Sequence, residues 1–132
     1  MNEKTDPIKL LWTGGSDSSF RMLEIVLMEK KPVQPYYFIA PRHRKSVWNE
    51  QKAQRKIKQA LFKKYPEAES LVLPTVNIPV AEILPDEEIA LANREAQAIT
   101  PMGRQYEFIA RYAKQHNIFD LELCIERSNN PE

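Results

Sequence analysis

The stretch Ile8-Lys-Leu-Leu-Trp-Thr-Gly-Gly-Ser-Asp-Ser-Ser19 decides the fold that we expect for this chain. Residues 8–12 form a short apolar run, which is typical of a buried strand. The glycine pair that follows lets the backbone turn tightly and come close to a ligand without a Cβ clash. Residues 18–30 carry apolar side chains around most of a helical circumference and predict a buried helix. The order of strand, glycine loop and helix indicates an α/β domain.

The rest of the chain continues this alternation, which favours a parallel sheet. Pro35 lacks an N–H, so we expect the second strand to start near Tyr36, and Pro74 predicts that the third strand is broken or at an edge. Ser46 and Asp86 are residue types that cap helices. The expected elements are strands at 33–40, 71–78 and 120–126 and helices at 46–65, 86–98 and 103–116.

Length and composition narrow the class of protein. A chain of 132 residues fits one domain, and 42% hydrophobic with 28% charged residues is typical of a soluble globular protein. The sequence has no bilayer-spanning apolar run and a polar start, so we expect a cytoplasmic protein. Cys124 is the only cysteine, which excludes an internal disulfide and predicts a packed thiol. Because the predicted order ends on a strand, we expect the N-terminal part of a longer protein, or a partner or second copy over the open face.

Charge is unevenly distributed along the chain. Residues 42–64 hold nine Lys and Arg against Glu50, and residues 66–99 hold seven acids against Arg94. The two segments could face each other, or the basic one could bind an anion. The basic run is typical of the wet face of a helix, and RNA binding is the alternative interpretation.

The glycine loop has the composition of a polyphosphate site. Thr13, Ser16, Ser18 and Ser19 supply hydroxyl donors, and the first N–H groups of the following helix point at a bound anion. Asp17 would either cap the helix or hold Mg²⁺ against the phosphates. The loop lacks the lysine of a Walker P-loop and the spacing of a dinucleotide fold. The alternative is a simple turn followed by a helix cap.

The segment Thr13-Gly-Gly-Ser-Asp-Ser-Ser19 resembles the SGGxDS[ST] signature of the PP-loop ATP pyrophosphatase superfamily. That superfamily includes argininosuccinate synthetase, GMP synthetase, tRNA-modifying enzymes and 7-cyano-7-deazaguanine synthase. Arg42-His-Arg44 is similar to the QRHR stretch of the last of these families, and Gly103-Arg-Gln105 is similar to its GRN. The zinc-binding cysteines of that family have no counterpart here, which leaves the substrate open.

The resemblance implies a three-layer α/β/α fold with an open parallel sheet of the Rossmann-like (HUP) type, in the order 3-2-1-4. It implies ATP and Mg²⁺ as cofactors and a reaction in which ATP adenylates an oxygen of a small-molecule or nucleobase-like substrate and releases pyrophosphate. Alternatives are a nucleotide-binding or sensor module without catalysis and a relative that modifies tRNA.

The resemblance also assigns residues to the site. The phosphates would be held by Thr13, Gly14, Gly15, Ser16, Asp17, Ser18 and Ser19, with Asp17 as the magnesium ligand. Adenine would meet the backbone at Ile39 and Ala40. Further binding residues would be Arg42, Arg44 and Gly103, and the catalytic residues would be Asp17, Arg42 and Arg104.

Overall fold

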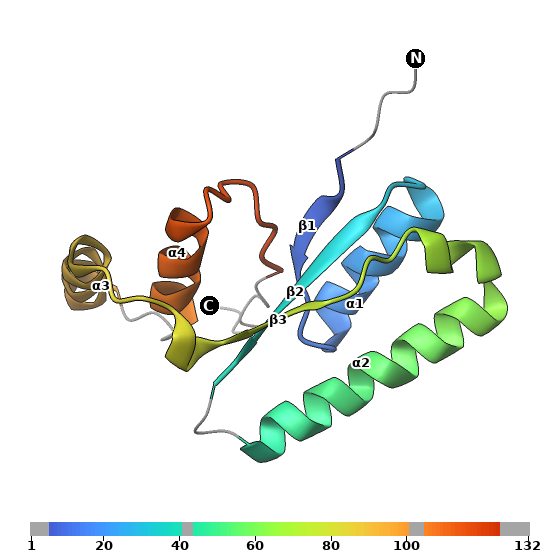
Figure 1. Ribbon diagram of the computed structural model, residues 1–132, viewed down its shortest axis with the longest axis horizontal. Helices are drawn as coiled ribbons and strands as arrows, with labels where there is room; N and C mark the ends of the chain where they lie inside the picture. The colour runs from blue at the N-terminus through green and yellow to red at the C-terminus, as the bar shows by residue number, and fades with distance from the viewer. Residues whose placement is uncertain (1–5, 41–43, 101–104, 125–132) are drawn as a thin grey trace, which may run out of the picture.

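The computed structural model describes residues 6–40, 44–100 and 105–124 (Figure 1). Strands and helices alternate, as the sequence predicts. Their bounds are β1 Ile8–Leu11, α1 Ser16–Leu23, η1 Glu24–Met28, β2 Val33–Ile39, α2 Arg44–Lys64, η2 Pro66–Ser70, β3 Val76–Pro79, η3 Val80–Glu82, α3 Glu87–Ile99 and α4 Gln105–Gln115. Within these ranges no helix is both long and apolar enough to cross a membrane.

The three strands form one parallel sheet in the order β1-β2-β3, which confirms the α/β class. The segment predicted as a fourth strand, residues 120–126, is described only as far as Cys124. It makes an isolated parallel bridge between Glu122 and Leu10. The Leu11 N–H donates to the Glu122 carbonyl at 2.9 Å, and the Glu122 N–H donates to the Lys9 carbonyl at 2.8 Å. The chain thus lies against the free edge of β1.

The prediction that β2 starts near Tyr36 is wrong, because the strand begins at Val33 and runs through Pro35. Both backbone groups of Val33 bond to residues 71–73. Pro35, two residues further on, has no N–H to offer in that direction. The Gln34 side-chain amide instead donates to the Pro74 carbonyl at 2.8 Å and bridges the gap. As predicted, the third strand is broken at Pro74, leaving an isolated bridge at Val72 and β3 beyond it.

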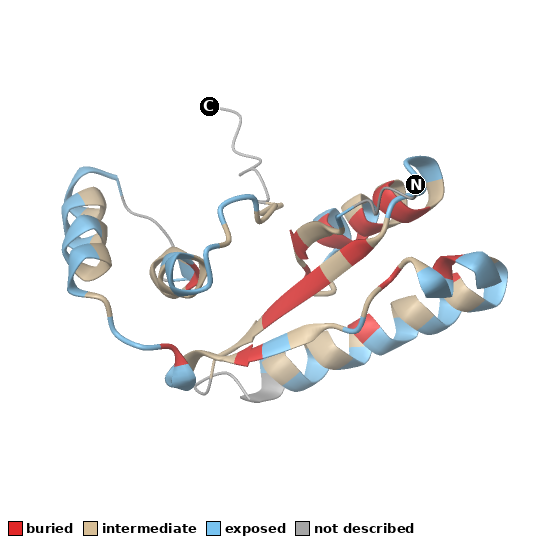
Figure 2. Ribbon diagram, turned by 45° about the horizontal axis from the view of Figure 1, so that its top comes forward, coloured by how far each residue is buried: buried red, intermediate tan, exposed pale blue. Residues whose placement is uncertain are grey.

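Helices cover both faces of the sheet and make three layers. On one face, α1, η1 and α2 enclose a core that includes Leu10, Trp12, Met22 and Ile25, all fully buried. On the other face, α4 packs against β2 and β3 through the cluster that contains Tyr36. Successive side chains of β2 point to opposite faces of the sheet and are covered on both, as in a strand that is buried on both sides. Figure 2 shows this burial concentrated on the strands and α1.

Two helices begin before their predicted first residues. α1 starts at Ser16 with Gly15 as its N-cap, and α2 starts at Arg44, so Ser46 lies inside its first turn and is not the cap. The cap at Asp86 is confirmed, since its carboxylate accepts the Ile89 N–H at 3.1 Å.

Arg21 fastens α1 to the end of the chain. Its guanidinium makes a two-pronged contact with Glu122, at 2.8 and 3.1 Å, and also bonds Glu24 and Glu29. The hydrogen bonds to Glu122 are the main reason that the pKa of Arg21 is raised. This network, together with the bridge at Leu10, holds residues 120–124 against the sheet.

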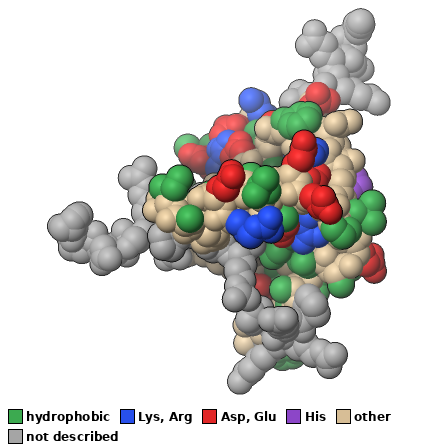
Figure 3. Space-filling view, turned by 90° about the vertical axis from the view of Figure 1, so that its left-hand side faces the viewer, with side chains coloured by type: hydrophobic (Ala, Val, Ile, Leu, Met, Phe, Trp, Pro, Cys, Tyr) green, Lys and Arg blue, Asp and Glu red, His purple; other side chains and the backbone are tan. Residues whose placement is uncertain are grey.

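The helix α3 packs on α4 but buries none of its own residues. Leu84, Leu91 and Ile99 are exposed there, and acidic side chains lie among the hydrophobic ones (Figure 3). α2 and α3 lie at opposite ends of the molecule (Figure 1), so the acidic helix does not face the basic one, whereas η2, which carries Glu67 and Glu69, contacts α2.

Candidate functional site

The glycine loop, residues 13–18, lies at the carboxyl end of β1 and passes close to α2. Gly14 has φ +91°, a conformation that side chains with a Cβ rarely adopt. A Cβ placed there would lie 3.0 Å from the Glu50 carbonyl oxygen and 3.3 Å from both the Ala53 Cβ and the Gln54 Cγ. Gln54 is itself fixed, because its Nε2 donates to the Trp12 carbonyl at 3.0 Å. Gly14 therefore allows the loop to turn against the backbone of α2.

Hydrogen bonds within the loop fix its shape. The Gly15 N–H donates to the Thr13 Oγ1 at 3.1 Å, and the Thr13 N–H donates to the Ser18 Oγ at 3.3 Å. Ser19 is buried, and its Oγ accepts the Trp12 indole N–H at 2.9 Å. Of the four hydroxyls that the sequence singles out, only that of Ser16 makes no hydrogen bond to a described residue and belongs to an exposed residue. Ser19 serves the core instead of the loop surface.

A small cavity of about 100 Å³ opens at this loop. Its lining consists of Leu11, Thr13, Gly15, Ser16, Asp17, Ser18 and Cys124. The first turn of α1 forms one wall, and the N–H groups of a first helical turn have no intrahelical acceptors. Together with the partial positive charge at a helix N-terminus, they favour an anion. The cavity therefore offers hydroxyl groups and a helix N-terminus, both of which can interact with an anion.

Asp17 has a carboxylate that is free for a metal ion. Gly15 occupies the N-cap position and no side chain caps the helix, so the capping role considered for Asp17 is excluded. The carboxylate is exposed and makes no hydrogen bond or ion pair with a described residue. No group of three His, Cys, Asp or Glu within the described ranges could hold a metal by itself. A magnesium ion here would need phosphate oxygens and water as its other ligands, as magnesium commonly does.

A larger cavity of about 270 Å³ adjoins the first and shares Leu11 and Thr13 with it. It lies between the carboxyl halves of β1 and β2 and the start of α4. Its other lining residues are Tyr37, Phe38, Glu50, Gln105, Phe108 and Ile109. The rings of Phe38 and Phe108 have their centroids 5.5 Å apart. The cavity thus combines an apolar, aromatic wall with a few polar groups, which is typical of a small-molecule site.

Tyr37 and Glu50 form a polar pair in this larger cavity. The Tyr37 hydroxyl donates to the Glu50 Oε1 at 2.6 Å. Burial, and then this hydrogen bond, raise the pKa of Tyr37. Sequence reasoning missed both residues, although the alternation along residues 33–40 places Tyr37 near the carboxyl end of the second strand. Glu50 is also the only acid in the basic segment, and that exception was the available signal.

Several residues assigned by resemblance have no described side chain. Arg42, Gly103 and Arg104 lie outside the described residues, and so does His43. The backbone of Arg44 begins α2, while its side chain is not described. Ile39 ends β2 and Ala40 follows it, just beyond Phe38 in the larger cavity. In the sequence, Arg42 and Arg44 follow β2, and Gly103 and Arg104 precede α4. Residues of both β2 and α4 line the larger cavity.

Cys124 lies closer to the loop than its sequence suggests. It packs against the core beneath α1 and also lines the small cavity. Burial, and then the negative charge of Glu122, raise the pKa of its thiol. A raised pKa disfavours the thiolate, which favours the interpretation of Cys124 as a packed thiol in the wall of the cavity.

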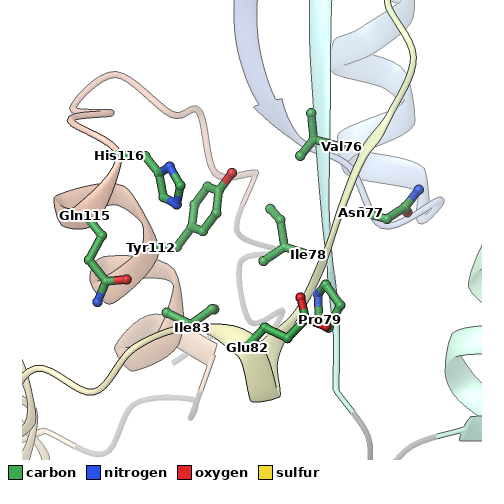
Figure 4. Close-up of a pocket in the computed structure, with 9 residues that line it drawn as sticks. All are labelled: Val76, Asn77, Ile78, Pro79, Glu82, Ile83, Tyr112, Gln115 and His116. Carbon is green, nitrogen blue, oxygen red and sulfur yellow. The ribbon is translucent and has the colours of Figure 1, made fainter.

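A third cavity, of about 270 Å³, lies between β3 and α4, and its lining includes no residue of the glycine loop. The ring of Tyr112, on α4, and that of His116, just after the end of α4, have their centroids 4.2 Å apart and face Val76 and Ile78 (Figure 4). Its lining combines apolar side chains that continue the core on this face of the sheet with the polar side chains of Asn77, Glu82, Gln115 and His116.

Comparisons of the chain with protein-family models, with curated proteins and with solved structures give no match in any of the three.

Proposed function

We propose that this chain is an ATP-binding protein of the PP-loop type, with a Rossmann-like sheet of HUP type. The observation that carries the proposal is the pair of adjoining cavities that meet at Leu11 and Thr13. One offers hydroxyls and helix N–H groups, and the other offers aromatic rings. Polyphosphate and nucleobase need these two environments in this order.

The phosphates would lie in the small cavity against the N-terminus of α1. Thr13 and Ser18 support the loop through their mutual hydrogen bond, while Ser16 keeps its hydroxyl for the ligand. The Asp17 carboxylate would hold Mg²⁺, whose charge would offset that of the phosphates. The nucleoside would occupy the larger cavity beside Phe38 and Phe108, with Glu50 able to accept a hydrogen bond from an N–H or O–H of the ligand.

The reaction that we propose is the adenylation of a substrate oxygen. The oxygen attacks the α-phosphorus of ATP, the bond from that phosphorus to the α–β bridging oxygen breaks, and pyrophosphate leaves with the bond electrons. The loop would hold the β- and γ-phosphates that form this leaving group. Arg42 and Arg104 are the expected partners of the negative charge that develops.

A module that binds ATP without cleaving it is the second candidate. It is favoured by one feature of the lining: among the described residues, no Lys or Arg lines either cavity. Within the described residues, charge that develops in a transition state would be met by helix N–H groups and hydroxyls, without a Lys or Arg. Binding alone requires less than this.

Incubation with ATP radiolabelled at the α-phosphorus, with Mg²⁺ and with candidate acceptors, separates the two. Adenylation predicts that the label appears in AMP or in an adenylated acceptor and not in ADP. Retention of label on the protein with no product identifies the module. If the protein retains no label and forms no product, ATP is not its ligand and the proposal is wrong.

A further inference from the structure

A cavity of about 330 Å³ lies between α2 and β3, apart from the glycine loop. Its lining consists of Gln51, Gln54, Arg55, Lys58, Pro74, Thr75 and Asn77. It shares no lining residue with the two cavities at the loop. The ionisable groups of this lining are both cations, and the other polar side chains are amides and a hydroxyl. We call this cavity the α2–β3 pocket.

Lys58 is held at the inner side of this pocket. Its Nζ donates to the Thr75 Oγ1 at 3.1 Å and lies 5.7 Å from the centroid of the Trp12 ring. The side chain is half-buried, and it makes no ion pair with an acid of the described residues. Burial lowers the pKa of Lys58 because no carboxylate offsets the loss of hydration. An ammonium has three donors, so donors remain for a ligand.

The neighbouring groups are arranged for the same kind of ligand. Arg55, one turn earlier on α2, is exposed and also makes no ion pair within the described part of the chain. The Gln54 amide is fixed on the Trp12 carbonyl, and the Asn77 Nδ2 lies 3.5 Å from the Thr75 carbonyl. The side-chain bond from Gln34 to the Pro74 carbonyl fixes the opposite wall. The pocket is therefore built before any ligand enters.

The surrounding field has the same sign. α2 is rich in Lys and Arg, with Glu50 as its only acid, and the carboxylate of Glu50 accepts from Tyr37. The acidic helix α3 is at the far end of the molecule (Figure 1). A concave site whose charged groups are all positive attracts anions from solution.

We propose that the α2–β3 pocket binds a phosphate group through Arg55 and Lys58, as a second anion site of this protein. Guanidinium and ammonium groups are the side chains that recognise phosphate, the first as a fork and the second as a point charge. The amides of Gln51 and Gln54 and the hydroxyl of Thr75 add neutral donors. The phosphate belongs either to a free polyphosphate or to a phosphodiester of single-stranded nucleic acid.

The test uses inorganic tripolyphosphate without Mg²⁺ and follows the backbone and side-chain amides of the full chain by NMR. The proposal predicts shifts at Gln51, Gln54 and Asn77. The double variant Arg55→Gln with Lys58→Gln should weaken this binding at least about tenfold, since it removes both charge-assisted contacts. The matched control, Lys56→Gln with Lys63→Gln, removes the same charge from exposed positions of α2 outside the pocket and should keep the affinity.

A single-stranded oligouridylate is the second probe and identifies the source of the phosphate. Shifts at the same amides by the oligonucleotide, at lower concentration than tripolyphosphate and with a steep salt dependence, support the phosphodiester. Shifts by tripolyphosphate alone support a free polyphosphate. If Lys58→Gln prevents folding, Arg55→Gln alone tests the site, with a few-fold loss expected. Shifts confined to residues 14–19, equal losses in both double variants, or no shift at millimolar probe would each overturn the proposal.

Discussion

Replacement of Gly14 by alanine tests the geometry of the glycine loop. The Cβ would lie 3.0 Å from the Glu50 carbonyl oxygen, and the backbone would have to keep φ +91°. Residues with a Cβ pay about 1–2 kcal/mol for such a left-handed conformation. Displacing a packed helix backbone adds about 1–3 kcal/mol. The smaller entropy of the unfolded alanine chain offsets about 0.4–1 kcal/mol.

These terms predict that Gly14→Ala lowers the free energy of unfolding by about 1–5 kcal/mol. The matched control is Gly15→Ala, because Gly15 has φ −76° and ψ 173°, an extended conformation that alanine adopts freely. Its Cβ would meet only the Thr13 Oγ1, at 3.3 Å. We expect a cost below about 1 kcal/mol for this variant.

Equilibrium unfolding in urea, followed by tryptophan fluorescence, measures both variants. We expect Gly14→Ala to lower the urea concentration at the unfolding midpoint clearly, with an unchanged slope of the free energy against urea. Gly15→Ala should lower that midpoint only slightly. Equal stability of the two variants would contradict the predicted clash of a Cβ at Gly14 with α2. It would mean that the loop does not turn against α2 as described.

Further variants test the contacts that hold the loop and the chain end. Ser19→Ala should destabilise the fold by about 1–3 kcal/mol and shift tryptophan emission, because the buried Trp12 indole N–H loses its acceptor. Arg21→Met should lower the free energy of unfolding by about 1–3 kcal/mol and speed amide hydrogen exchange around Glu122, because two nitrogens of the Arg21 guanidinium donate to the Glu122 carboxylate. Unchanged exchange around Glu122 would count against this network. The raised pKa of Tyr37 means that the folded state holds the phenol proton more tightly than the unfolded state. The stabilisation that comes from this proton is therefore full below the usual tyrosine pKa and is lost as pH rises through the raised pKa. In strong alkali, the free energy of unfolding of Tyr37→Phe should consequently fall less with rising pH than that of the unchanged chain.

The periodicity of the sequence predicted most of the fold. Apolar runs and alternation located β1, β2 and α4 within a few residues, and the Asp86 cap was correct because it depends only on local hydrogen bonding. The start of β2 was mispredicted because the missing N–H of Pro35 is answered by the side chain of Gln34. The acceptor of that bond, the Pro74 carbonyl, lies on a neighbouring segment of the fold, so the compensation leaves no trace in a local pattern.

The site was predictable only in part. The order of strand, glycines and hydroxyls predicted a loop at the start of α1, and the described geometry has one there. The inward turn of Ser19 depends on the Trp12 indole, seven positions earlier. Cys124 reaches the small cavity through a bridge to β1, a long-range contact that spacing does not reveal.

The most direct test of ATP binding at the glycine loop is a calorimetric titration with ATP and Mg²⁺. It compares the unchanged chain with Ser16→Ala combined with Asp17→Ala, and with Glu69→Ala combined with Ser70→Ala as a control at exposed residues of η2. We expect the unchanged chain and the control to bind ATP alike, and the loop variant to bind it at least about tenfold more weakly. Equal binding by all three proteins, or no binding by any, would contradict this expectation.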